Sequence, residues 1–317
     1  MALTKWRESL KRKIRLGKTV AARKRKSSGG LQRKLSGKEL REQLEFLYRR
    51  FHRPQNIQGD PLSFAHRYPK PKDRELVAFL SALCAYGNVR AILGFLETFL
   101  SRLEASPSER LMNASRADLK ELSARLVYRF YRPEDFYDLL RALQGVLRDK
   151  ESLEAVFLMS QKSAYVDRLD DFLAEIKRRL PSLSDRPGLR FMLPDILRGA
   201  AKRIHLFMRW VVRSDGLDLG LWNSVSCSEL LIPLDVHIFR ASRSLGICSR
   251  STPDLLSVFE ITENLQKIDP TDPIRFDFAL CHAGIQGFNG EESVQKQSLR
   301  AASKLQGAGE DREHLLL

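Results

Sequence analysis

The sequence predicts an all-α protein, and three observations support this. Apolar residues recur at intervals of three and four along most of the chain, which is the spacing of one helical face. Residues that start or stop helices, such as Pro133, Ser152 and Gly246, bound these stretches. No stretch shows the apolar–polar alternation of a half-buried strand. Helices of ordinary length, in one large domain or two coupled lobes, are therefore expected.

The formal net charge of +15 is concentrated at the N-terminus, because residues 1–38 hold 14 Lys and Arg but one acid, Glu8. We expect residues 1–38 to form a disordered basic arm. The arm either binds phosphates, or only solubilises the protein, or is added by an upstream start codon. Residues 39–289 would form the folded body, and the polar residues 290–317 a disordered C-terminal tail.

Several classes of protein are excluded by the sequence. It has no apolar run of about 18 residues, so no membrane span is expected, and its N-terminus lacks the apolar region of a secretory signal. The four cysteines are far apart and form no C-x-x-C pair, so neither a metal site nor a cofactor is predicted. We expect a cytoplasmic protein with reduced thiols.

The first half of the body is expected to begin with a helix at 37–51. Asp73 is then expected to cap a helix at 75–86, after a loop rich in turn residues at 53–72. This second helix is apolar nearly all round, which predicts the central core helix. Pro181 and Pro187 should bracket a loop. Amphipathic helices are predicted between these features at 91–103, 117–129, 133–148, 153–160 and 166–180.

A basic stripe is predicted on the helical stretch 199–213. Its apolar residues fall on one face. The other face carries Lys202, His205, Arg209 and Arg213 without any acid. Such a stripe suits an anion, although a solvated polar face would look the same. A helix near 253–266 and a buried segment at 274–284 close the fold.

Asp235 stands directly before another helical pattern, which ends at Gly246. An Asp there accepts backbone amides from the first turn and lies at the positive end of the helix dipole. These properties define an ordinary helix cap, and they are also what a catalytic carboxylate at the rim of a cleft needs. His237, two residues further on, could face such a cleft or bond a backbone carbonyl.

Residues 234–246 resemble the catalytic segment of the helix-hairpin-helix base-excision DNA glycosylases, the superfamily of endonuclease III. The likeness covers the Asp, the His, the first Arg and the Leu-Gly of that segment, here Asp235, His237, Arg240 and Leu245-Gly246. The helix at 76–86 and the segment 278–284 agree in order with the core helices of the superfamily. The resemblance spans about residues 70–285 and implies a two-lobed helical fold with a cleft between the lobes.

The chain more closely resembles an uncharacterised bacterial family across nearly the whole body, although membership supplies no activity. Five motifs carry this resemblance: Asp60-Pro61 with His66-Arg67-Tyr68, Ala85–Asn88, Phe207–Arg213, Pro233–His237 and Asp272–Leu280.

The segment 193–202 departs from the glycosylase pattern, because it keeps Leu-Pro, one Gly and a Lys but loses the tight hairpin. Lys202 and Asp235 are 33 positions apart, a separation similar to that in archaeal 8-oxoguanine glycosylases.

The glycosylase resemblance implies that Asp235 stabilises the sugar cation and that Lys202 attacks C1′ of a flipped, damaged nucleotide. Aromatic walls for the base are expected from Phe207, Trp210 or Trp222. DNA contacts are expected from Arg203, Arg209, Arg213, His237 and Arg240.

Two other functions stay open. The chain could bind DNA or structured RNA without catalysis, or it could be an unrelated helical interaction protein. Its protein partners cannot be named from the sequence. In those cases Asp235 is only a helix cap and Lys202 only a surface charge.

Overall fold

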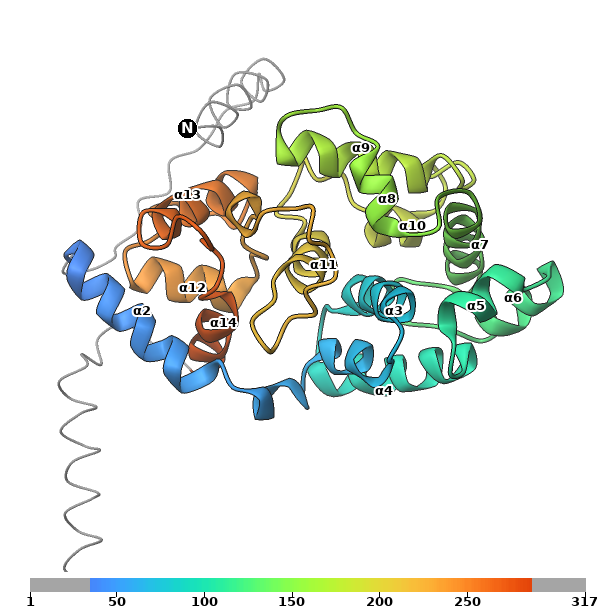
Figure 1. The fold of residues 1–317 in the computed structure, drawn as a ribbon, viewed down its shortest axis with the longest axis horizontal. Coiled ribbons are helices and arrows are strands. Elements are labelled where there is room, and N and C mark those ends of the chain that lie inside the picture. Colours follow the sequence, from blue (N-terminus) through green and yellow to red (C-terminus); the bar gives the residue numbers. More distant parts are fainter. Residues whose placement is uncertain (1–34, 287–317) are drawn as a thin grey trace, which may run out of the picture.

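The computed structural model describes residues 35–286, and within that range it is helical and contains no β-strand (Figure 1). The all-α prediction is therefore confirmed. The expected C-terminal tail and residues 1–34 of the expected arm lie outside the described residues, whereas Ser36 already caps the first described helix. The α-helices are α2 (Gly37–Phe51), α3 (Pro71–Cys84), α4 (Val89–Leu100), α5 (Pro107–Asn113), α6 (Arg116–Ser123), α7 (Pro133–Lys150), α8 (Leu153–Leu158), α9 (Tyr165–Lys177), α10 (Pro187–Met192), α11 (Lys202–Val212), α12 (Val236–Ser244), α13 (Leu255–Gln266) and α14 (Asp277–Ile285).

Local capping explains where most helices begin. Ser36 accepts the amide of Glu39, whose carboxylate accepts the amide of Ser36 in return. Ser152 caps α8 as expected, and α7 begins at Pro133, whose fixed φ suits a first helical position. These starts depend on neighbouring residues alone, which is why the sequence predicts them.

The start of α3 differs from the prediction. Asp73 was expected to cap this helix, but α3 begins at Pro71 and places Asp73 inside its first turn. The Asp73 carboxylate is buried and accepts both the backbone amide (2.8 Å) and the hydroxyl (2.5 Å) of Ser108 in α5. Asp73 therefore fixes one helix against another. The prediction that α3 is the central core helix agrees with its burial along nearly its whole length.

Short helices were the main elements missed. Neither α5 nor α10 was predicted, because a helix of two turns carries too little apolar periodicity to stand out. The helix expected at 117–129 ends instead at Ser123, and Arg125 and Arg129 take positive φ angles of 59° and 55°. A residue with positive φ cannot continue an α-helix, and an arginine side chain gives no indication that Arg125 or Arg129 adopts this conformation.

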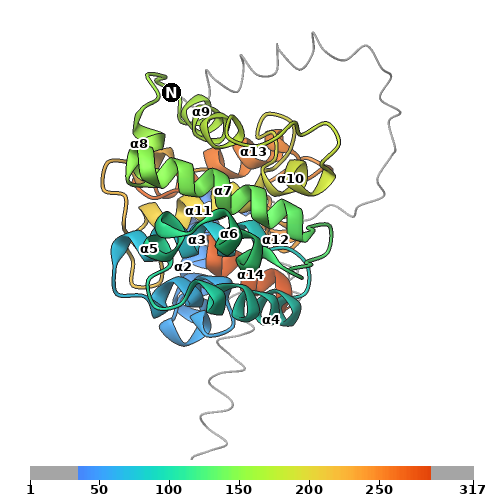
Figure 2. The same cartoon turned by 90° about the vertical axis from the view of Figure 1, so that its right-hand side faces the viewer.

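The helices form two groups with α11 between them (Figure 1). In the first group, α14 packs against both α2 and α12, so the start and the end of the described chain lie together. The second group contains α3 to α10, and Figure 2 shows the long α7 lying across it. Helix α11 packs against α3. No helix among residues 35–286 is long and apolar enough to cross a membrane.

Candidate active site

Asp235 is the N-cap of α12. Its Oδ1 accepts the backbone amides of His237 and Ile238, both at 2.9 Å. These two bonds fix the carboxylate at the positive end of the helix dipole. Its second oxygen, Oδ2, contacts groups from two other helices, α11 and α14.

Lys202 forms an ion pair with this oxygen. Its Nζ lies 3.2 Å from Asp235 Oδ2, although the two residues come from different helices. Ala201, directly before α11, adopts a left-handed conformation with φ of 43°, which turns the chain sharply into the helix at Lys202. The Lys202 side chain keeps 32% of its exposure and that of Asp235 keeps 12%, so the pair can be reached from solvent.

Helix α14 closes the site behind Asp235. Cys281 Sγ lies 3.8 Å from Asp235 Oδ2, as a weak thiol donor. Burial raises the pKa of Cys281 well above its usual value, so the thiol stays protonated. This approach depends on Gly284, where a Cβ atom would come within 2.5 Å of the carbonyl oxygen of His237. The contact of Cys281 with Asp235 is visible only in the fold.

Asp277 lies beneath this site and is almost fully buried. Burial raises its pKa to about 6, against the opposing effect of Arg209, and the nearby charge of Asp235 adds to the rise. Arg209 bonds Asp277 Oδ2, while Asp277 Oδ1 has no hydrogen-bond partner in the described structure. The site therefore combines an accessible Lys–Asp pair with a second, poorly solvated carboxyl group.

Apart from Lys202, the basic stripe expected on α11 is buried, which corrects the predicted positions of Arg209 and Arg213. Arg209 Nη2 lies 3.0 Å from Asp218 Oδ1, and Arg213 Nη2 lies 2.9 Å from Asp272 Oδ2. Both arginines are only 2% exposed. The prediction considered the residues of α11 alone, and the acids that neutralise the stripe come from later loops. These arginines connect segments of the fold and do not present charge to a phosphate.

Arg203 is also buried, which corrects its expected DNA-facing position. Its Nη1 donates to the carbonyl of Leu83 at 2.8 Å and also bonds the hydroxyl of Tyr131. Its Nη2 bonds the carbonyl of Phe191. The guanidinium group thus joins the end of α3 to two later segments of the second group.

His205, the remaining basic residue expected on that face, is fully buried, and burial lowers its pKa to about 4. The expected aromatic walls are a further correction. Phe207, Trp210 and Trp222 are all buried in the core, and Trp222 donates its indole N–H to Glu75 at 2.7 Å. Large aromatic residues on a core helix fill the interior more favourably than they line a wet site.

His237 and Arg240 are the two expected DNA contacts that are not buried. Arg240 is exposed on α12, and His237 is partly buried with Nδ1 lacking a hydrogen-bond partner in the described structure.

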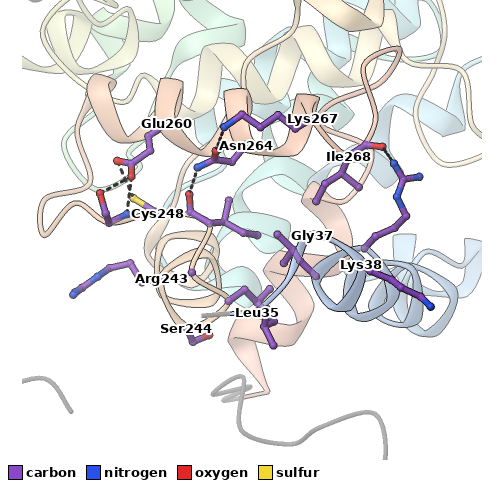
Figure 3. Close-up of a pocket in the computed structure, with 16 residues that line it drawn as sticks. Leu35, Gly37, Lys38, Arg243, Ser244, Cys248, Glu260, Asn264, Lys267 and Ile268 are labelled. Atoms are coloured by element: carbon purple, nitrogen blue, oxygen red, sulfur yellow. Dashed lines mark hydrogen bonds between the residues drawn. The ribbon is translucent and has the colours of Figure 1, made fainter. Parts of the chain in front are cut away.

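A separate groove lies at the opposite end of α12, between α2 and α13 (Figure 3). Asn264 spans part of it by donating to the carbonyl of Ile247 at 2.7 Å, while Lys267 donates to Asn264 at 2.8 Å. Neither Lys202 nor Asp235 lines this groove. Among the described residues, no cluster of three or more His, Cys, Asp or Glu side chains could hold a metal ion.

The fold and the site define a class of all-helical protein in which a partly exposed Lys–Asp pair links the start of α11 to the start of α12. Residues 60–286 match the family model described as a protein of unknown function (DUF2400), and the chain belongs to that family. No curated protein and no solved structure matches the chain. The family match covers the Lys–Asp pair and the helices that hold it.

Proposed function

We propose that the protein is a DNA base-excision glycosylase or lyase that acts on a flipped, damaged base. The observation that carries the proposal is the 3.2 Å separation of Lys202 Nζ and Asp235 Oδ2, from residues at the starts of two helices. In this proposal the two groups of helices are the two lobes of a glycosylase-like fold. The pair lies where they meet, because α11 packs on α3 and α12 packs on α14.

The proposed chemistry assigns one role to each member of the pair. The departing base takes a proton from the Lys202 ammonium, which leaves the amine free to act as a nucleophile while Asp235 stays ionised. The amine forms a bond to C1′ as the bond from C1′ to the base breaks, and the base departs with the bonding electrons. The cap on Asp235 keeps its charge near the cationic sugar that develops in the transition state. Asp235 then passes a proton from the new amine nitrogen to O4′ as the C1′–O4′ bond breaks, which gives the Schiff base between Lys202 and C1′. Loss of a C2′ proton from this Schiff base would then allow strand cleavage.

Duplexes carrying 8-oxoguanine, uracil or an alkylated base test this function in the presence of borohydride. The wild-type protein should form a stable adduct with at least one duplex, and Lys202→Ala should abolish it. Lys267→Ala is the matched control, because Lys267 is an exposed lysine at the far end of α12. An adduct that survives Lys202→Ala would assign the amine elsewhere, and absence of any adduct or base release would refute the proposal.

A second candidate is a nucleic-acid-binding protein without catalysis. The connection between α10 and α11 favours it, because the amide of Leu197 is bonded by the side chain of Asp195 and the amide of Arg198 by its carbonyl. Those amides are not free to hold a phosphate as a tight hairpin would. Salt-dependent duplex affinity with no base release would favour this candidate over the enzyme.

A further inference from the structure

An exposed aromatic pair, Phe130 and Phe191, lies beside the guanidinium group of Arg203. Phe130 is 61% exposed and Phe191 is 40% exposed, and their ring centroids are 5.5 Å apart. The guanidinium group of Arg203, the residue after Lys202, lies 4.4 Å from the centroid of the Phe191 ring. The pair is therefore connected directly to the helix that carries the proposed nucleophile.

A rigid turn exposes the Phe130 ring to solvent. Tyr128 and Tyr131 bond each other's backbone at 3.2 and 2.9 Å, which leaves Arg129 and Phe130 at the tip. The hydroxyl of Tyr128 donates to the carbonyl of Tyr86 at 2.5 Å, and that of Tyr131 donates to the carbonyl of Leu83 at 2.9 Å. Both ends of the turn are thus fixed to the second group of helices. The Phe130 ring is presented at a fixed place even though it buries little of its surface.

Phe191 is supported from below in a similar way. Tyr86 packs edge-on against it with a centroid distance of 4.9 Å. Gly188, earlier in α10, allows that helix to approach the turn, because a Cβ atom there would lie 2.9 Å from the carbonyl oxygen of Phe130. The two exposed rings therefore belong to one preformed surface.

The segments that carry these rings are rich in arginine. The three segments that build the surface, 86–91, 125–132 and 187–192, contain five arginines and no acid. Among the described residues, none of these arginines forms an ion pair, unlike the buried arginines of α11. The five are Arg90, Arg125, Arg129, Arg132 and Arg190. A ligand that offers both flat aromatic faces and negative charge complements this surface, and nucleic acid has both properties.

We propose that Phe130 and Phe191 form a stacking platform for nucleobases of a DNA strand, next to the nucleotide held at Lys202. The inference rests on the proposed function, because that function supplies the DNA. The platform stacks on bases left unpaired when one nucleotide is withdrawn from the duplex, while the arginines hold the adjacent phosphates. Stacking on rigid rings favours the distorted duplex over an intact one.

Affinity of the full-length protein for a duplex with a central tetrahydrofuran abasic analogue tests the platform, because this analogue has no base to release. Phe130→Ala should weaken binding by about tenfold, the loss expected for one stacked base, and Phe130→Trp should retain it. Met159→Ala is the matched control, since Met159 is 48% exposed on a different part of the surface. Arg190→Ala should reduce the slope of log affinity against log salt by about one, whereas Phe130→Ala should leave that slope unchanged.

The outcomes separate this inference from the proposed chemistry. A loss of affinity in Phe130→Ala without any borohydride adduct or base release by the wild type would support the platform and refute the enzyme. Adduct formation together with affinities of Phe130→Ala and wild type within twofold of each other would overturn the platform alone. The high exposure of Phe130 means that Phe130→Ala should fold normally, which circular dichroism and thermal unfolding would verify.

Discussion

Two substitutions of Asp235 separate its cap from its charge. Asp235→Ala leaves the amides of His237 and Ile238 without their acceptor and should lower the free energy of unfolding by about 1–2 kcal/mol. Asp235→Asn keeps an oxygen for these amides, and Asn is as good a cap as Asp. It should cost only about 0.5 kcal/mol, because the Lys202 ion pair is partly exposed and charge–dipole terms at helix ends are small.

Urea unfolding followed by far-ultraviolet circular dichroism at neutral pH measures both costs. Asp254 provides the matched pair of control variants, since it caps α13 through the amide of Ser257 and also pairs with an arginine. The Asn and Ala variants at Asp254 should show the same order of stability. If Asp235→Asn destabilised the protein as much as Asp235→Ala, the charge and not the cap would hold α12, and the reasoning would be wrong.

Three further predictions concern the core. Gly284→Ala should cost at least about 1 kcal/mol, because its Cβ would meet the backbone of α12, whereas Gly94→Ala on the exposed face of α4 should stabilise by about 0.5–1 kcal/mol in the same urea assay. His205 has its pKa lowered to about 4, so its contribution to stability is present above pH 6.5 and is lost as the pH falls towards 4. His205→Leu should therefore remove about 2 kcal/mol of the stability difference between pH 7 and pH 5, and an unchanged difference would contradict this assignment. Glu75→Ala should cost about 3 kcal/mol or more, because two amides at the start of α8 and one indole N–H lose their buried acceptor, and a thermal unfolding midpoint equal to that of the wild type would refute it.

Local signals predicted most helices of the body. The caps at Ser36 and Ser152 and the proline at the start of α7 act within one turn of chain, and a single sequence contains that information. The burial and pairing of the basic residues on α11 depend on residues outside that helix. Arg213 pairs with Asp215 and Asp218 in the loop after α11 and with Asp272, 59 positions later, and no periodicity within α11 reveals these partners.

The candidate site was accessible to sequence reasoning only in part. The resemblance to glycosylases selected Lys202 and Asp235, and the structure brings the two side chains together, while their catalytic role stays a prediction. Cys281 and Asp277 could not be selected, since their closeness to Asp235 depends on how α14 packs against α12. Phe130 was missed because hydrophobic residues in short segments are usually buried, and its exposure follows from the turn that holds it.

The packing of α2 on α14 affects how the chain folds during its synthesis. Helix α2 leaves the ribosome first among the described helices, yet one of its main partners, α14, is translated last among them. The part of the apolar face of α2 that packs on α14 therefore stays exposed while more than two hundred residues are added. Contacts between segments so far apart in sequence also form slowly. Synthesis that stops before α14 would release a polypeptide in which the second group can fold but α2 has no surface to cover it. Such a fragment would be a natural substrate for chaperones and proteases.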